Sequence, residues 1–218
     1  MYGFVRCDIQ RTAVTDIVSL LILMLVLPNT LEQYNTVIEE CRSIFAKKNA
    51  DYGLSWRVLR LPSLTDQIYI KAKRIRSIED KGVQRIADPL DDEWRAIVNY
   101  CIMALIELAL PATQKNTNDN ALTAHLSFEE AIALYDRTAD ATRDLMLAKN
   151  HDYGEAWRDM RIASFTDLIL TKLLRIKQIE DNHGKTTVSE GVGANYSDIL
   201  NYAVFALIQI AEQREGNA

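Results

Sequence analysis

The stretch Lys48-Asn49-x-Asp51-Tyr52-Gly53-x-x-Trp56-Arg57 occurs a second time, 101 residues later, as Lys149-Asn150-x-Asp152-Tyr153-Gly154-x-x-Trp157-Arg158. The two stretches belong to segments 41–80 and 142–181, which align without a gap and are identical at 19 of 40 positions. A repeat of this length defines the folding unit. Most of the shared residues are polar or aromatic, whereas a repeat kept only for its core would share apolar positions. The duplication therefore indicates a functional site that is present twice.

The similarity continues beyond these segments. Residues 97–106 match residues 199–208 at an offset of 102. The segment between the copies is rich in Thr, Asn, Gln and Ala without an apolar period, which is typical of a linker. The sequence thus predicts four parts: an N-terminal extension (1–30), a first helical repeat (31–110), a linker (111–126) and a second helical repeat (127–213).

Composition indicates a globular chain, because 48% of the residues are hydrophobic and 25% are charged. The net charge of −5 argues against general DNA coating, which needs an excess of Lys and Arg, but it leaves room for a basic nucleotide pocket. The three cysteines, Cys7, Cys41 and Cys101, lack metal-ligand spacing. Reduced thiols of this kind are typical of a cytoplasmic protein, and we expect that location.

The N-terminal extension contains an apolar run at residues 17–27 behind Arg6 and Arg11. The run is too short to span a bilayer, so no membrane span is expected. Three interpretations stay open: packing against the protein, a true start of translation at Met24, and a targeting segment. A secretory signal lacks support because no small-x-small cleavage site follows the run before Pro28, and the first two interpretations are favoured because the rest of the chain shows cytosolic cysteine usage.

Each repeat shows three helical patterns. The first has apolar residues at three- and four-residue spacing from Tyr34 to Phe45, and Gly53 or Gly154 follows it as a left-handed stop. The second is expected to begin near Thr65 or Thr166. The third covers about 94–108 and 196–210, and it is apolar nearly all round, as a central helix would be. We predict an all-α fold of two tandem copies packed as a pseudo-symmetric helical bundle.

The second helix of each repeat carries charges on or beside its apolar face. They are Lys71, Arg74 and Glu79 in the first copy, and Lys172, Arg175 and Glu180 in the second. Buried charges are costly unless they are paired. Either they form ion pairs between helices, or Lys71, Arg74, Lys172 and Arg175 bind phosphate while Glu79 and Glu180 help to hold a metal.

The third helix adds a polar residue to each core. Asn99 and Asn201 lie among apolar neighbours, so each is either a satisfied core residue or part of a cavity. A carboxylate shares that face, Asp92 in the first copy and Asp198 in the second, at different positions relative to the Asn. If these carboxylates hold a metal, the two copies are not chemically equivalent.

The loop after the first helix supplies aromatic residues and cations. We expect Tyr52, Trp56, Tyr153 and Trp157 to stack on a base and Arg57 and Arg158 to hold phosphate, although core packing is an equally ordinary role for Trp and Tyr. The adjacent His151-Asp152 is Ala50-Asp51 in the first copy, so a phosphohydrolase built on His-Asp is not favoured.

These motifs, with T-D-x-x-x-x-K-x-x-R-I-x-x-I-E-D in the second helix and I-x-N-Y-x-x-x-A-L-I in the third, resemble the nucleotide modification associated domain 1 family. The resemblance covers about 31–110 and 127–213 and looks like a two-copy form from Bacteroidetes-type bacteria. It implies a role with a nucleotide or modified nucleotide. The helical make-up is also distantly similar to MazG-like nucleoside triphosphate pyrophosphohydrolases.

The MazG-like enzymes hold Mg²⁺ with E-x-x-E and E-x-x-D pairs on successive helices, a pattern from which this sequence departs. Two hypotheses follow. The first is a Mg²⁺-dependent pyrophosphohydrolase acting on a deoxynucleoside triphosphate or modified nucleotide, with Glu79, Asp92, Glu180 and Asp198 as candidate metal residues. The second is a non-catalytic nucleotide-binding or protein-interaction module. No catalytic residue is assigned.

Overall fold

The computed structural model describes residues 30–111, 126–185 and 190–216. The chain divides into two compact units, Met1–Gln33 and Tyr34–Ala218. Of the first unit only residues 30–33 are described, and all contacts below lie within the second. The predictions for residues 1–29, for Cys7 and for most of the linker fall outside the described residues.

Each copy forms three α-helices with a short 3₁₀ helix after the first. The first copy contains α2 (Thr30–Tyr52), η1 (Ser55–Val58), α3 (Leu61–Lys81) and α4 (Leu90–Ala109). The second contains α5 (Phe128–Tyr153), η3 (Ala156–Asp159), α6 (Ile162–Asp181) and α7 (Val192–Glu215). The described residues contain no strand, which confirms the predicted all-α class. None of these helices combines the length and the apolar character needed to cross a bilayer.

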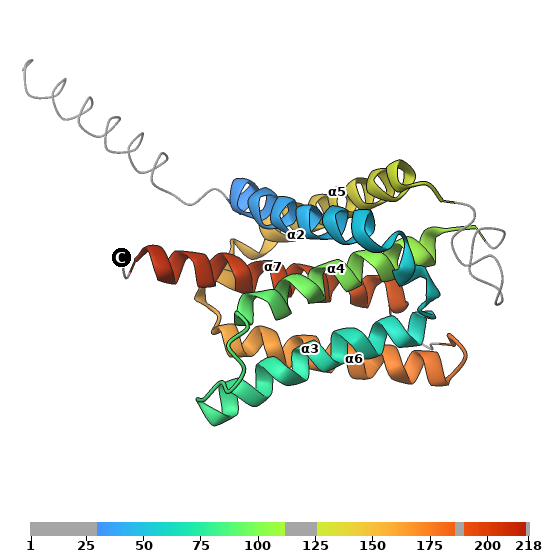
Figure 1. Cartoon of the computed structure of the whole chain (residues 1–218). Coiled ribbons are helices and arrows are strands. Elements are labelled where there is room, and N and C mark those ends of the chain that lie inside the picture. Colours follow the sequence, from blue (N-terminus) through green and yellow to red (C-terminus); the bar gives the residue numbers. More distant parts are fainter. Residues whose placement is uncertain (1–29, 112–125, 186–189, 217–218) are drawn as a thin grey trace, which may run out of the picture. The chain divides into compact units, whose positions relative to one another are not determined.

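The two central helices are α4 and α7, which pack against each other (Figure 1). On one side α3 packs on α4, α6 packs on α7, and α3 and α6 contact each other. On the other side lie α2 and α5 (Figure 1). The central position follows from sequence, since α4 and α7 are apolar on nearly every face and bury residues such as Trp94, Ile102 and Ile199 completely.

The helix boundaries agree with the sequence at one end and differ at the other. Gly53 and Gly154 have φ values of +61° and +59°, so both first helices stop at a left-handed glycine as predicted. The predicted start of the second helix was wrong, because α3 begins at Leu61 with Pro62 in its first turn. Thr65 therefore lies inside the helix and does not cap it.

A pair of reciprocal hydrogen bonds relates the two copies. The hydroxyl of Tyr34 donates to Asn201 Oδ1 (3.0 Å), and the hydroxyl of Tyr135, the equivalent tyrosine, donates to Asn99 Oδ1 (2.9 Å). Burial raises the pKa of both tyrosines, so each keeps its proton. Each buried Asn is thus satisfied by the other copy, as expected of a core polar residue.

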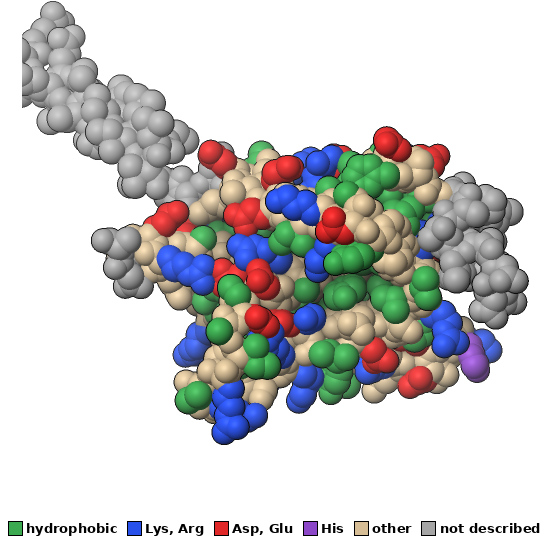
Figure 2. Space-filling view, viewed as in Figure 1, with side chains coloured by type: hydrophobic (Ala, Val, Ile, Leu, Met, Phe, Trp, Pro, Cys, Tyr) green, Lys and Arg blue, Asp and Glu red, His purple; other side chains and the backbone are tan. Residues whose placement is uncertain are grey.

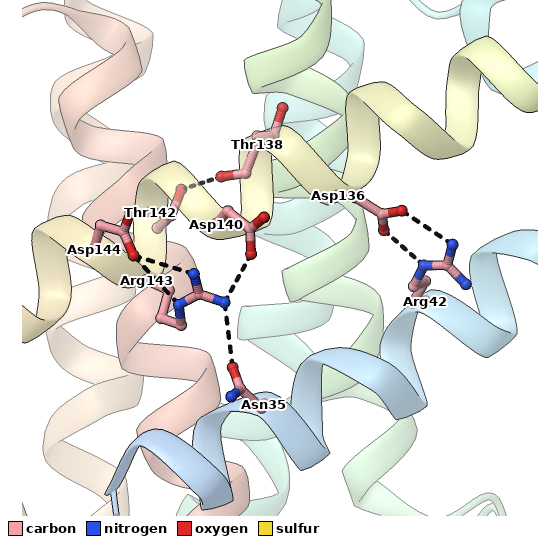
Figure 3. A network of polar contacts seen from close by, with 8 residues as sticks. All are labelled: Asn35, Arg42, Asp136, Thr138, Asp140, Thr142, Arg143 and Asp144. Atoms are coloured by element: carbon pink, nitrogen blue, oxygen red, sulfur yellow. Dashed lines mark hydrogen bonds and ion pairs between the residues drawn. The ribbon is translucent and has the colours of Figure 1, made fainter.

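The same relationship holds between the helices α2 and α5 (Figure 3). Arg42 of α2 pairs with Asp136 of α5 through Nε and Nη2, at 2.6 and 3.0 Å. Its equivalent Arg143 of α5 donates to Asn35 of α2 at 3.5 Å. Asn35 and Asp136 occupy equivalent positions, so one contact is the copy of the other.

A third set of reciprocal contacts joins α3 and α6. Thr65 donates to Glu180 Oε1 (2.8 Å), and Thr166 donates to Glu79 Oε1 (2.9 Å). The next residue of each copy continues the pattern: Asp66 pairs with Lys177, and Asp167 pairs with Arg76. The two repeats therefore pack about a pseudo-twofold axis, which confirms the predicted pseudo-symmetric bundle.

Candidate functional site

Two pockets lie at equivalent places in the two copies. The first pocket, about 740 Å³, is lined by the end of α2, by η1 and by parts of α3 and α4. The second pocket, about 410 Å³, is lined by the corresponding parts of α5, η3, α6 and α7. Figure 2 shows hydrophobic side chains gathered between α2 and α3, with acidic and basic side chains beside them.

The repeated motifs supply the walls of both pockets. Apart from Leu168, every residue lining the second pocket is the repeat equivalent of a residue lining the first. The shared identical residues are Lys48, Asn49, Tyr52, Trp56, Asn99 and Tyr100 in the first copy, and Lys149, Asn150, Tyr153, Trp157, Asn201 and Tyr202 in the second. The duplicated polar and aromatic residues therefore define one site built twice.

The walls of the first pocket are held by hydrogen bonds between its own residues. Asn49 Oδ1 accepts from Trp56 Nε1 (3.1 Å), and Asn49 Nδ2 donates to Phe45 O (2.7 Å). Asn99 Nδ2 donates to Cys41 O (3.0 Å). Trp56 is buried, whereas 72% of Tyr52 is exposed at the pocket rim. The ring of Tyr52 is thus available to a ligand, and the indole of Trp56 is mainly wall.

The second pocket is occupied more fully by its own side chains. The ring of Phe205 stacks on Trp157 with centroids 4.4 Å apart, and the guanidinium of Arg158 lies 4.3 Å from the same ring. Asn150 donates to Glu155 and leaves Trp157 Nε1 without a partner. Both tryptophans are buried, so the predicted stacking role rests on Tyr52 and Tyr153, both largely exposed.

Two of the predicted phosphate ligands meet a buried carboxylate. Glu93, 3% exposed, pairs with Arg74 and lies 3.1 Å from Lys71 Nζ. Lys71 and Glu93 line the first pocket, and Arg74 is not among its lining residues. Asp88, which is largely exposed, lies 3.9 Å from Arg74 Nη2 and gives that guanidinium a second, weaker partner.

In the second copy the carboxylate comes from another position. Asp198 binds Lys149 (2.9 Å) and Lys172 (2.6 Å), whereas the equivalent of Glu93 is Asn195. Burial raises the pKa of Asp198, but the hydrogen bonds from the two lysines outweigh that effect and leave it below its ordinary value. Arg175, the equivalent of Arg74, is exposed and has no ion pair with a described residue.

Arg57 and Arg158, predicted to hold phosphate, line neither pocket. Arg57 is buried and donates from Nε to Glu107 Oε1 (2.9 Å). Arg158 pairs with Glu155 (2.6 Å) and Glu212 (2.8 Å). Both guanidinium groups anchor the loop to the third helix of their own copy, because a buried arginine needs a carboxylate close by.

The four predicted metal residues are dispersed. Glu79 and Glu180 accept hydrogen bonds across the α3–α6 contact, Asp92 pairs with Arg95 at the rim of the first pocket, and Asp198 is held by lysines. Among the described residues no group of three or more His, Cys, Asp or Glu side chains is placed to hold a metal ion. The predicted set does not converge on one point.

The structure adds residues that the sequence prediction left out. Lys48, Lys149, Tyr100, Tyr202 and Glu93 line a pocket, or interact with a residue that does. The two lysines at the end of the first helix and the two tyrosines of the third helix are identical between the copies, so the repeat alone could have identified them as site residues. The repeat could not have identified Glu93, because the equivalent residue in the second copy is Asn195.

Fold and site together define a class: an all-α protein of two tandem copies, each with a pocket lined by its repeated polar and aromatic residues. The model of the nucleotide modification associated domain 1 family matches residues 48–108 and 149–210, which contain most of the pocket-lining residues. The chain belongs to this family, in a two-copy form. No curated protein and no solved structure matches it.

Proposed function

We propose that this chain is a nucleotide-binding protein whose ligand occupies the first pocket. Family membership supports a nucleotide-related role. The observation that carries the proposal is the convergence of the repeated Lys48, Asn49, Tyr52, Trp56 and Tyr100 on a pocket of about 740 Å³. Pockets of 300–1,000 Å³ are the usual size for small ligands and cofactors.

The pocket offers two kinds of group that a nucleotide needs. Tyr52 is an exposed aromatic ring at the rim, and aromatic rings stack on any base at about 1–3 kcal/mol per base. Lys48 and Lys71 supply cations on the same pocket, and ammonium groups bind phosphate as point charges. We place the base at Tyr52 and the phosphates toward these lysines.

The first pocket suits this ligand better than the second. The second is smaller, and Phe205 fills it from the position that the more flexible Met103 occupies in the first. Since Phe205 already stacks on Trp157, a base would have to displace it. A single bound nucleotide per chain is therefore the expected stoichiometry.

A Mg²⁺-dependent pyrophosphohydrolase, in the manner of the MazG-like enzymes, is the second candidate. It is favoured by Glu93, a buried carboxylate on the pocket wall whose Oε2 makes no hydrogen bond, although Lys71 Nζ lies 3.1 Å away. A carboxylate on a pocket wall can act as a general base when an attacking water lies within hydrogen-bond reach of it. Mg²⁺ would arrive with the nucleotide phosphates, because it keeps waters and phosphate oxygens in its shell, and Asp92 is the predicted metal residue that lines this pocket.

The experiment is a panel of standard and modified nucleoside triphosphates, each with and without Mg²⁺, followed by thermal shift and pyrophosphate release together. Stabilisation of the protein by at least one nucleotide supports binding. Pyrophosphate release that needs Mg²⁺ and is lost in Glu93→Gln establishes the enzyme. If no nucleotide stabilises the protein and none is hydrolysed, the proposal is wrong.

A further inference from the structure

The second copy contains an anion that the first copy lacks. The carboxylate of Asp198 lies between Lys149 Nζ (2.9 Å) and Lys172 Nζ (2.6 Å), and only 13% of its side chain is exposed. Asp198 lines the second pocket together with Lys149. The carboxylate of Asp198, held between the two lysines, therefore faces the space in which a ligand would lie.

The first copy keeps the equivalents of both lysines but has no carboxylate at the position equivalent to Asp198. Lys48 and Lys71 are the equivalents of Lys149 and Lys172, and the equivalent of Asp198 is Ala96. All three line the first pocket. A methyl group thus stands where the second copy has an acid.

The described acids near Ala96 pair with Lys71, Arg74 and Arg95 and leave Lys48 over. Lys48 has no ion pair with a described residue. Lys71 shares the buried carboxylate of Glu93 with Arg74. The other acid near Arg74 is Asp88, largely exposed and 3.9 Å away, where solvent weakens its effect. Arg95 is already paired with Glu40 and Asp92.

We propose that the space above Ala96 is an anion subsite, in which Lys48 and Lys71 hold a phosphate group at the position that the Asp198 carboxylate occupies in the other copy. In the second copy the carboxylate of Asp198 occupies this subsite and pairs with both lysines, and it thereby excludes phosphate from the second pocket. This inference rests on the proposed function for its ligand, a nucleotide phosphate, but the subsite itself would bind a free polyphosphate by the same chemistry.

The test exchanges the two positions and uses inorganic tripolyphosphate and the four standard deoxynucleoside triphosphates as probes in calorimetric titrations. Wild-type protein is expected to bind one tripolyphosphate. Ala96→Asp places a carboxylate between Lys48 and Lys71 and should weaken that binding at least tenfold. Ala96→Asn is the matched control, because it fills the same space without the charge and should weaken binding less.

The reverse change supplies a second, independent reading in case Ala96→Asp fails to fold. Asp198→Ala frees Lys149 and Lys172 and should raise the stoichiometry from one tripolyphosphate to two. Unchanged affinity in Ala96→Asp, or equal losses in the Asp and Asn variants, would overturn the subsite, as would an unchanged stoichiometry in Asp198→Ala.

The two proposals fail in different ways. If tripolyphosphate binds and responds to Ala96→Asp while no nucleoside triphosphate competes with it, the subsite stands and nucleotide binding is wrong. If nucleotides bind equally well to wild type and Ala96→Asp, nucleotide binding stands and the subsite is wrong. If neither probe binds wild type and tripolyphosphate fails to bind Asp198→Ala, both are wrong.

Discussion

The hydroxyl of Tyr34 donates to Asn201 Oδ1 across 167 residues of sequence, and Tyr135 repeats this bond on Asn99. Each tyrosine belongs to the first helix of one copy, and each Asn lies on the central helix of the other. Because all four side chains are buried, these bonds fix the two copies in one relative position. The walls of both pockets include these Asn side chains, so the packing of the copies and the shape of the site are linked.

Tyr34→Phe and Tyr135→Phe should each lower the free energy of unfolding by about 1–3 kcal/mol, because each leaves a buried Asn oxygen without its donor. Urea unfolding monitored by circular dichroism measures the change. Tyr52→Phe is the control, since its hydroxyl is exposed and should change stability by no more than about 0.5 kcal/mol. Equal stability of Tyr34→Phe and Tyr52→Phe would show that the cross-copy bond contributes nothing.

Glu79→Gln and Glu180→Gln should leave nucleotide affinity and turnover within about twofold of wild type, a difference of about 0.4 kcal/mol. In the structure both carboxylates accept a Thr hydroxyl at the α3–α6 contact, and a Gln oxygen can accept the same bond. The measurement is nucleotide titration and pyrophosphate release with each variant. Loss of Mg²⁺-dependent turnover in either variant would indicate that the substituted glutamate belongs to a metal site.

Glu180→Gln should also change the pH dependence of stability. Burial raises the pKa of Glu180 above its ordinary value of 4.5, so its charged form costs stability above the folded pKa. Wild type should therefore gain stability relative to the variant as the pH falls from 7 through that pKa. Unfolding curves between pH 4 and 7 provide the comparison, and parallel curves would contradict the assigned environment.

Asp198→Asn should have the opposite dependence. The pKa of Asp198 is held below its ordinary value of 3.8, so its charged form stabilises the fold above that value, and this contribution is lost as the pH falls through the folded pKa. The variant is expected to be less stable than wild type by about 1–3 kcal/mol at pH 7. Urea unfolding of both proteins at several pH values should show this difference constant above pH 5 and shrinking below pH 4.

Cys41 and Cys101 should resist alkylation in the native protein. Both thiols are fully buried, and burial raises the pKa of Cys41 to about 12 and that of Cys101 well above its ordinary value. Since the thiolate is the reactive form, iodoacetamide should modify these residues only after unfolding. Peptide mapping by mass spectrometry measures the labelling of each cysteine separately. Rapid labelling of Cys41 or Cys101 in the native protein would contradict the packing of its helix.

Helix positions were predictable because apolar spacing reports the buried face of each helix directly. The start of α3 was not, since Thr65 resembles a cap in sequence and only the structure shows it inside the helix with its hydroxyl donating to Glu180. The site likewise had one part that the sequence predicted and one part that depends on tertiary packing. The repeat drew attention to loop and third-helix residues that line the two pockets. The pairing of Arg57 with Glu107, 50 residues away, depends instead on how α4 packs. Local sequence does not encode that partner.

The central claim is that the first pocket, and not its copy, binds the nucleotide through Tyr52. The most direct measurement compares Tyr52→Ala with its exact repeat equivalent Tyr153→Ala by calorimetric titration with the nucleotide that most stabilises wild type. Loss of stacking at Tyr52 should weaken binding by about 5- to 150-fold, whereas Tyr153→Ala should bind as wild type does. Equal effects at the two tyrosines, or an effect at Tyr153 alone, would contradict the claim.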